Sequence, residues 1–212
     1  MGPIVRSNGN MLLRLIRLFL GLIVYGVGCA LLVQAGVGLD PWTVLAEGLS
    51  LQTGIGIGWI VVILGAVVLL LWIPLRQRPG FGTIANILVV GTVMQGALEI
   101  IPPVEGFVWG VLVFLLGIAA IAVASAVYIG TRFGPGPRDG LMTGLHARLG
   151  WPIWLCRFIV EGTVLLTGWL LGGTVGLGTV LFAALIGPAV HLAMDLSARW
   201  ETRRTPKTLV AS

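Results

Sequence analysis

The chain has 212 residues, of which 57% are hydrophobic and only 10% carry a charge. Soluble domains carry about 25% charged residues, so this chain could not cover a soluble globular surface. The composition excludes a soluble enzyme, a nucleic-acid-binding domain and a disordered protein. It predicts an integral membrane protein whose immediate partner is the lipid bilayer.

The hydrophobic residues fall into six stretches that approach or exceed the roughly 20 residues needed to cross a bilayer. In chain order these are residues 15–33, 57–75, 81–101, 107–129, 151–171 and 175–196. Two further segments of 13 residues, 41–53 and 137–149, are too short to span and favour re-entrant or interfacial helices. We therefore expect an all-α polytopic membrane protein with an N-terminal segment (1–14) and a basic C-terminal tail (197–212).

The two halves of the chain match each other when the sequence is shifted by 96 positions. Gly38 then falls on Gly134, Pro41 falls on Pro137, and the Gly-x-Gly-Thr sequence at 80–83 falls on that at 176–179. The shift indicates a duplication, with repeats at residues 15–101 and 107–196. Each repeat holds three crossings and one short helix. Because three is an odd number, the second repeat must enter the bilayer from the opposite side, which predicts inverted topology.

The positions of the Arg and Lys residues test this arrangement independently. Twelve of the 13 basic residues lie before or at the very start of the first crossing, after the last crossing, or in the connections 76–80 and 130–150. The other connections contain no Lys or Arg. The positive-inside rule therefore predicts that both termini are cytoplasmic. The net charge of +5 is explained by these loops, and we expect no nucleic-acid partner.

Glycine and proline interrupt the chain before each short segment, and these breaks are the first candidate site. Glycines allow sharp turns, proline suits the first position of a helix, and an aspartate before it is a suitable N-cap. A helix N-terminus inside a membrane could bind a solute or ion. The alternative is a tight loop that caps an interfacial helix. The candidate residues are Gly36, Gly38, Asp40 and Pro41 in the first break, and Gly134, Gly136, Arg138 and Asp139 in the second.

Two further pairs of ionisable residues lie inside apolar stretches. Arg157 and Glu161 are four residues apart on one helix face, and such residues usually face a cavity or a partner. They would bind a solute or ion, or else lock helices together as a structural pair. His191 and Asp195 are also four apart, and Glu99 is the repeat counterpart of Asp195. These three form a candidate proton relay, with snorkelling or capping near the interface as the alternative.

Signs of other chemistry are few. The chain has two histidines and no His-Glu-x-x-His motif, so we expect no metal site. Ser50 and Ser125 have no base nearby in the sequence, and we expect neither a cofactor nor an enzymatic activity. Cys29 and Cys156 lie inside apolar stretches, where they suit packing.

The break motifs carry a resemblance. The sequences Gly38-Leu-Asp-Pro-Trp42 and Gly134-Pro-Gly-Pro-Arg-Asp-Gly-Leu-Met142 resemble those of the bacterial YczE-like integral membrane proteins, which are related to the YitT group. The likeness extends over residues 15–196. It implies a location in the bacterial plasma membrane and supplies no catalytic residues.

These observations favour a small secondary transporter or permease that moves a small solute or ion by alternating access. The alternative is a non-transporting partner or regulator of another membrane complex. A homodimer would suit the small size of the chain. Substrate identity does not follow from the sequence.

Overall fold

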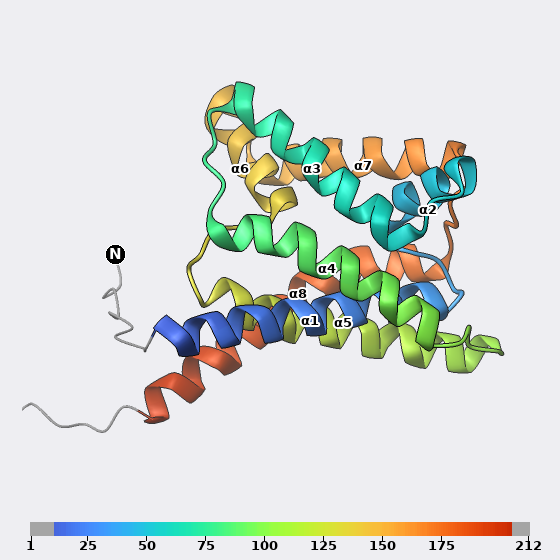
Figure 1. Ribbon diagram of the computed structural model, residues 1–212, viewed down its shortest axis with the longest axis horizontal. Coiled ribbons are helices and arrows are strands. Elements are labelled where there is room, and N and C mark those ends of the chain that lie inside the picture. Colours follow the sequence, from blue (N-terminus) through green and yellow to red (C-terminus); the bar gives the residue numbers. More distant parts are fainter. Residues whose placement is uncertain (1–10, 205–212) are drawn as a thin grey trace, which may run out of the picture.

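The computed structural model describes residues 11–204, with side chains as far as residue 199, and these residues form helices and no strands. The helices are α1 (Met11–Gln34), α2 (Pro41–Thr53), α3 (Ile57–Leu75), α4 (Phe81–Ile100), α5 (Phe107–Ile129), α6 (Pro137–Leu149), α7 (Ile153–Leu170) and α8 (Leu177–Arg204). Six of them, all except α2 and α6, are long and apolar enough to cross a membrane. Figure 1 shows these six running in roughly one direction across the molecule.

The bounds of α2, α3, α5 and α6 coincide with those predicted from the sequence. Helix α1 begins earlier than expected because Arg14 lies in its first turns, where the guanidinium donates to the Thr131 carbonyl over 2.8 Å and lies over the Phe133 ring. Residues 197–204, expected in the tail, continue α8. The remaining parts of the predicted terminal segments, 1–10 and 205–212, lie outside the described residues.

The 96-residue offset recurs in the helix bounds and in the backbone. Helices α1, α2, α3 and α4 begin at residues 11, 41, 57 and 81, and α5, α6, α7 and α8 begin at 107, 137, 153 and 177. The breaks repeat as well. Gly36 and Arg132 adopt left-handed φ angles of 64° and 58°, and Gly38 and Gly134 adopt φ angles of 115° and 123°. The two halves therefore share a local conformation as well as a sequence pattern.

Each break packs against the last helix of the other half. The backbone N–H of Gly82, at the start of α4, donates to the Phe133 carbonyl over 2.9 Å. The backbone N–H of Gly178, at the start of α8, donates to the Val37 carbonyl over 2.7 Å. The two hydrogen bonds are equivalent under the 96-residue shift. Their donors, Gly82 and Gly178, are 96 residues apart, and so are their acceptors, Val37 and Phe133.

The core forms around α1 and α5, which pack against each other along their length and carry α4 and α8 on their flanks. Helix α2 packs on α7, and α6 packs on α3, so the short helices form a second layer with α3 and α7 (Figure 1). Small residues allow the close approach of α1 and α5: a methyl group added at Gly28 would lie 3.2 Å from the Gly117 carbonyl oxygen.

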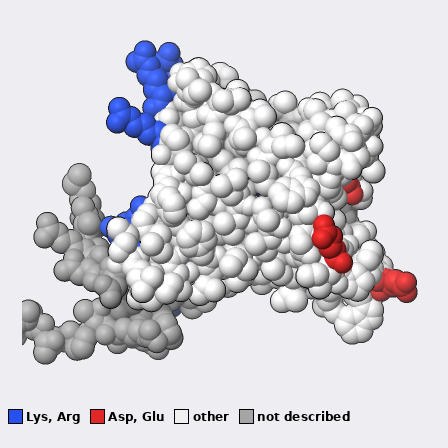
Figure 2. Space-filling model, in the orientation of Figure 1, with Lys and Arg blue, Asp and Glu red and all other residues white. Residues whose placement is uncertain are grey.

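Charged side chains separate along the long axis of the molecule. Figure 2 shows the Lys and Arg side chains at one end and the visible Asp and Glu side chains toward the other. We call these the basic end, with Arg76, Arg78, Arg132 and Arg148, and the acidic end, with Glu47, Glu99 and Glu105. On the face shown in Figure 2, few charges lie on the broad apolar surface between the two ends, which suits a protein embedded in lipid.

Candidate functional site in a central cavity

The two short helices begin deep in the molecule and end at its surface. Asp40 caps α2 by accepting hydrogen bonds from the backbone N–H and the hydroxyl of Thr43, and Pro41 occupies the first position of the helix. Asp40 and Val44 are buried, whereas residues 51–53 at the other end of α2 are exposed. Helix α6 likewise begins at the buried Pro137 and ends at the exposed Leu149. Each short helix therefore runs from the interior of the molecule to its surface.

The first turns of the two short helices meet. An Arg138 guanidinium nitrogen lies 3.3 Å from an Asp40 carboxylate oxygen, and the Asp40 side chain is 3% exposed. The Arg138 guanidinium also lies over the Trp42 ring, 5.1 Å from its centroid. Because burying an unpaired charge is costly, this ion pair compensates the burial of both groups.

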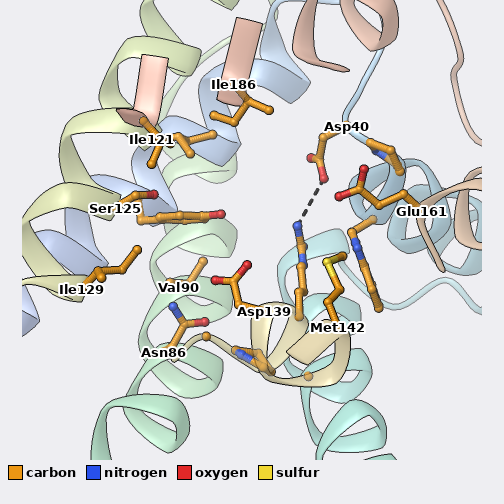
Figure 3. A pocket seen from close by; sticks show the side chains of 18 of the residues that line it. Asp40, Asn86, Val90, Ile121, Ser125, Ile129, Asp139, Met142, Glu161 and Ile186 are labelled. Carbon is orange, nitrogen blue, oxygen red and sulfur yellow. Dashed lines mark hydrogen bonds and ion pairs between the residues drawn. The ribbon is translucent and has the colours of Figure 1, made fainter. Parts of the chain in front are cut away.

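A cavity of about 370 Å³ opens beside this ion pair, within the 300–1,000 Å³ range of ligand sites. Figure 3 shows Asp40, Asp139 and Glu161 around a common space. Apolar residues such as Val90, Ile121 and Ile186 form the remaining wall. The polar or charged residues that line the cavity are Tyr25, Asp40, Trp42, Asn86, Ser125, Tyr128, Arg138, Asp139, Arg157, Glu161 and His191.

Asp139 differs from the other acids of the cavity. It is exposed and has no basic nitrogen within ion-pair distance among the described residues. By contrast, Glu161 pairs with Arg157 across one turn of α7 at 3.0 Å. The Arg157 and Glu161 side chains are 51% and 31% exposed, so this pair lines the open cavity and is not buried between helices.

The structure brings the residues singled out from the breaks and from α7 into this one cavity. Asp40, Pro41, Arg138, Asp139, Arg157 and Glu161 all line it, as does Gly136. Gly36, Gly38 and Gly134 do not line it, and Gly38 and Gly134 turn the chain where the breaks touch the other half. No group of three or more His, Cys, Asp or Glu within the described residues could hold a metal ion.

The structure does not assemble the residues of the candidate proton relay at one place. His191 lines the cavity and lies 3.7 Å from Asp195. Glu99 does not line the cavity. It lies in the last turn of α4, where it accepts a hydrogen bond from the Gln95 amide over 3.0 Å. A relay through all three residues therefore lacks a continuous path.

Several lining residues were not singled out from the sequence. Tyr25 and Tyr128 are the two tyrosines of the chain, and their rings meet edge to face at 6.2 Å. Tyr25 lies in the middle of α1, away from the interfacial positions that tyrosine favours in membranes, which was a usable signal. Asn86 and Ser125, also in the cavity wall, gave no pattern that could be read without the fold.

The two halves differ at the interface between their last two helices. We call these interfaces the α3–α4 seam and the α7–α8 seam. Helices α3 and α4 pack closely, since a methyl group added at Gly58 would lie 2.4 Å from the Gly91 carbonyl oxygen. Their counterparts α7 and α8 make little contact, and a methyl group at Gly187, the counterpart of Gly91, would meet nothing within 4 Å. Glu161 occupies the position equivalent to Gly65. Residues of α3, α4, α7 and α8 all line the cavity, but only the α7–α8 seam lacks close packing.

Comparisons with known proteins agree with the resemblance seen in the sequence. A family described as "Family of unknown function (DUF6198)" matches residues 12–195. An uncharacterized protein of Haemophilus influenzae is 40% identical over 182 residues, which are 86% of this chain and 84% of that protein. The uncharacterized membrane protein YczE of Bacillus subtilis is 29% identical over 181 residues, 84% of each chain. The uncharacterized protein YyaS of the same organism is 26% identical over 186 residues, 85% of this chain and 92% of that protein. No solved structure matches the chain.

Proposed function

The chain belongs to the DUF6198 family, and we propose that it is a small secondary transporter of two inverted repeats that moves a small solute or ion by alternating access. Inverted repeats are a recurring plan of such transporters, with the substrate site at the repeat interface and broken helices pointing into it. The 96-residue offset in helix bounds and break conformations supports the repeat. The three crossings in each half support its inversion.

The observation that carries the proposal is the difference between the two equivalent seams. The α3–α4 seam is closed and the α7–α8 seam is open. In an inverted repeat, exchanging these two conformations would close the cavity on one side and open it on the other. The shared sequence plan supports two such states. Glu161 and Trp154, in place of Gly65 and Gly58, would make the closed form of the α7–α8 seam wider than that of the α3–α4 seam.

The open side of the cavity is directed toward the basic end. Arg157 lies in the second turn of α7 and Ser125 in the last two turns of α5, and both helices reach the basic end there. The positive-inside rule assigns the basic end to the cytoplasm, so the present conformation is inward-open. Both termini are then cytoplasmic, and the membrane is the inner membrane of a bacterium.

A matched pair of cysteines tests alternation without knowledge of the substrate. Ser125 lines the cavity, and Cys29 is its repeat counterpart. Their exposed fractions are 6% and 5%, so they are equally shielded from bulk solvent. We would label Cys29 in a Cys156→Ala background, and Ser125→Cys in a background without Cys29 and Cys156, with membrane-impermeant MTSET from each side of the membrane.

The labelling pattern separates the proposal from its alternative. A transporter should show Ser125→Cys labelled from the basic side and Cys29 labelled from the acidic side, because the cavity reaches each in turn. Labelling of Ser125→Cys alone, with Cys29 inert from the acidic side over hours, would overturn alternating access. That result would favour a non-transporting partner or regulator of another membrane complex.

A further inference from the structure

The charges that line the cavity do not balance. Three carboxylates, of Asp40, Asp139 and Glu161, face two guanidinium groups. Arg138 is engaged by Asp40 at 3.3 Å, and Arg157 by Glu161 at 3.0 Å. With both bases committed to partners, Asp139 is left as one negative charge without an ion pair. A ligand that neutralises it must carry a single positive charge.

The rest of the cavity wall indicates the chemistry of the uncharged part of that ligand, which we call the guest. Most lining residues are aliphatic or aromatic, and Tyr25, Trp42 and Tyr128 present rings to the same space. Aromatic faces attract organic cations, and an apolar wall excludes a strongly hydrated metal ion. Trp42 adds an independent sign of a guest, because its indole N–H is buried at this cavity without an acceptor among the described residues.

Without a guest, the same carboxylate needs a proton to become neutral. The other charged and titratable groups that line the cavity are Tyr25 on α1, Tyr128 on α5, Arg138 on α6, Arg157 and Glu161 on α7, and His191 on α8, together with Asp40 before α2. As a cation enters, the O–H bond of the Asp139 carboxylic acid breaks, its electron pair stays on the carboxylate, and the proton passes to solvent. No other bond changes.

We propose that the Asp139 carboxylate binds either a proton or a monovalent organic cation with an apolar body, so that the cavity exchanges one for the other. This inference rests on the proposed function and specifies its substrate class and coupling ion. Proton–cation exchange would follow from a single shared site, since occupation by one excludes the other. The Arg138–Asp40 and Arg157–Glu161 pairs keep the surrounding charge neutral throughout.

The test is a binding titration with benzyltrimethylammonium, a permanent cation whose own charge does not vary with pH. Purified protein in detergent would be titrated by calorimetry between pH 5 and 8, in two buffers with different heats of ionisation. We expect affinity to fall about tenfold per pH unit once Asp139 is protonated, with up to one proton released per cation bound. Benzoate and neutral benzyl alcohol should not compete.

Variants test whether the released proton comes from Asp139. Asp139→Asn should weaken binding at least tenfold and abolish proton release, whereas Asp139→Glu should retain both. Glu105→Gln, an acid in the exposed connection at the acidic end, serves as the matched control and should bind like the wild type. The retained folding of Asp139→Asn can be checked by its elution as a single species.

Three results would contradict the binding of a cation at Asp139, and they can be told apart from a failure of alternating access. Equal binding by wild type and Asp139→Asn, a preference for benzoate, or binding without proton release would overturn the inference. Alternating access is measured separately, through Cys29 labelling in the absence of any ligand. Labelling of Cys29 without cation binding would therefore reject the inference alone, whereas the reverse would reject alternating access and leave a cation-binding membrane protein.

Discussion

Arg138 and Asp40, 98 residues apart in the sequence, form an ion pair of 3.3 Å between the first turns of two helices that belong to different halves of the chain. The pair is therefore a contact between the two halves of the chain. It joins the start of α2 to the start of α6 at the edge of the cavity. Loss of either charge should loosen this junction as well as change the cavity.

We expect the Arg138–Asp40 pair to contribute measurably to stability. Removal of one partner of a buried ion pair typically costs about 3–5 kcal/mol, because the other charge is left uncompensated. Arg138→Gln should cost more than Asp40→Asn, since it leaves the Asp40 carboxylate, which is 3% exposed, without its partner. Asparagine at position 40 can still cap α2. Thermal unfolding in detergent micelles would measure both.

The double variant Asp40→Asn/Arg138→Gln supplies the control for this prediction. It should be less destabilised than the sum of the two single variants, because neither charge is then left alone. Strict additivity would show that the two groups do not interact in solution.

The membrane orientation is a second prediction. If the basic end faces the cytoplasm, a cysteine at Glu105 should react with an impermeant maleimide in intact cells. A cysteine at Ala147, which is also exposed, near the end of α6, should react only after permeabilisation. Cys29 and Cys156 would first be replaced by alanine. Reaction of Ala147→Cys in intact cells would reverse the assignment.

The helices of this fold could be predicted closely from the sequence, whereas the cavity could be predicted only in part. Hydrophobic length set the six long helices, and Pro41 and Pro137 marked the starts of the short ones. Spacing along a helix also paired Arg157 with Glu161, since residues four apart are neighbours on one face. Such local rules say nothing about groups 98 residues apart, which is why Asp40 and Arg138 were named as site residues but not as partners.

The difference between the two seams could have been predicted from positions at which the two halves of the sequence carry different residues. Gly65 in α3 is replaced by Glu161 in α7, and Gly58 by Trp154. Two helices cannot approach as closely through a glutamate and a tryptophan as through two glycines. The unmatched positions of the duplication therefore carried as much information about the cavity as the matched ones.

Packing of α7 on α2 yields a third prediction from two glycines in one helix. A methyl group at Gly168 would lie 2.4 Å from the backbone nitrogen of Leu45, whereas one at Gly162 would meet nothing within 4 Å. Gly168→Ala should therefore destabilise the protein by about 1–3 kcal/mol through overpacking. Gly162→Ala should be neutral or stabilise by up to about 1 kcal/mol through helix propensity. Similar unfolding temperatures for the two variants would contradict this packing.

Equivalent glycines in the two halves give the last prediction, which connects packing to alternation. A methyl group at Gly91 would lie 2.4 Å from the Val62 side chain and 2.7 Å from the Gly58 carbonyl oxygen, whereas Gly187 has open space. Gly91→Ala should therefore disfavour the closed α3–α4 seam, while Gly187→Ala should leave the present conformation unchanged.

The readout is again Cys29, which should become exposed when the α3–α4 seam opens. Gly91→Ala should raise the rate of MTSET labelling at Cys29 from the acidic side at least threefold, which corresponds to a shift of about 0.7 kcal/mol between the two states. Gly187→Ala is the matched control and should not raise this rate. If Gly91→Ala lowers the unfolding temperature without any change in Cys29 labelling, the seam is a fixed packing contact, and its closure is not part of a transport cycle.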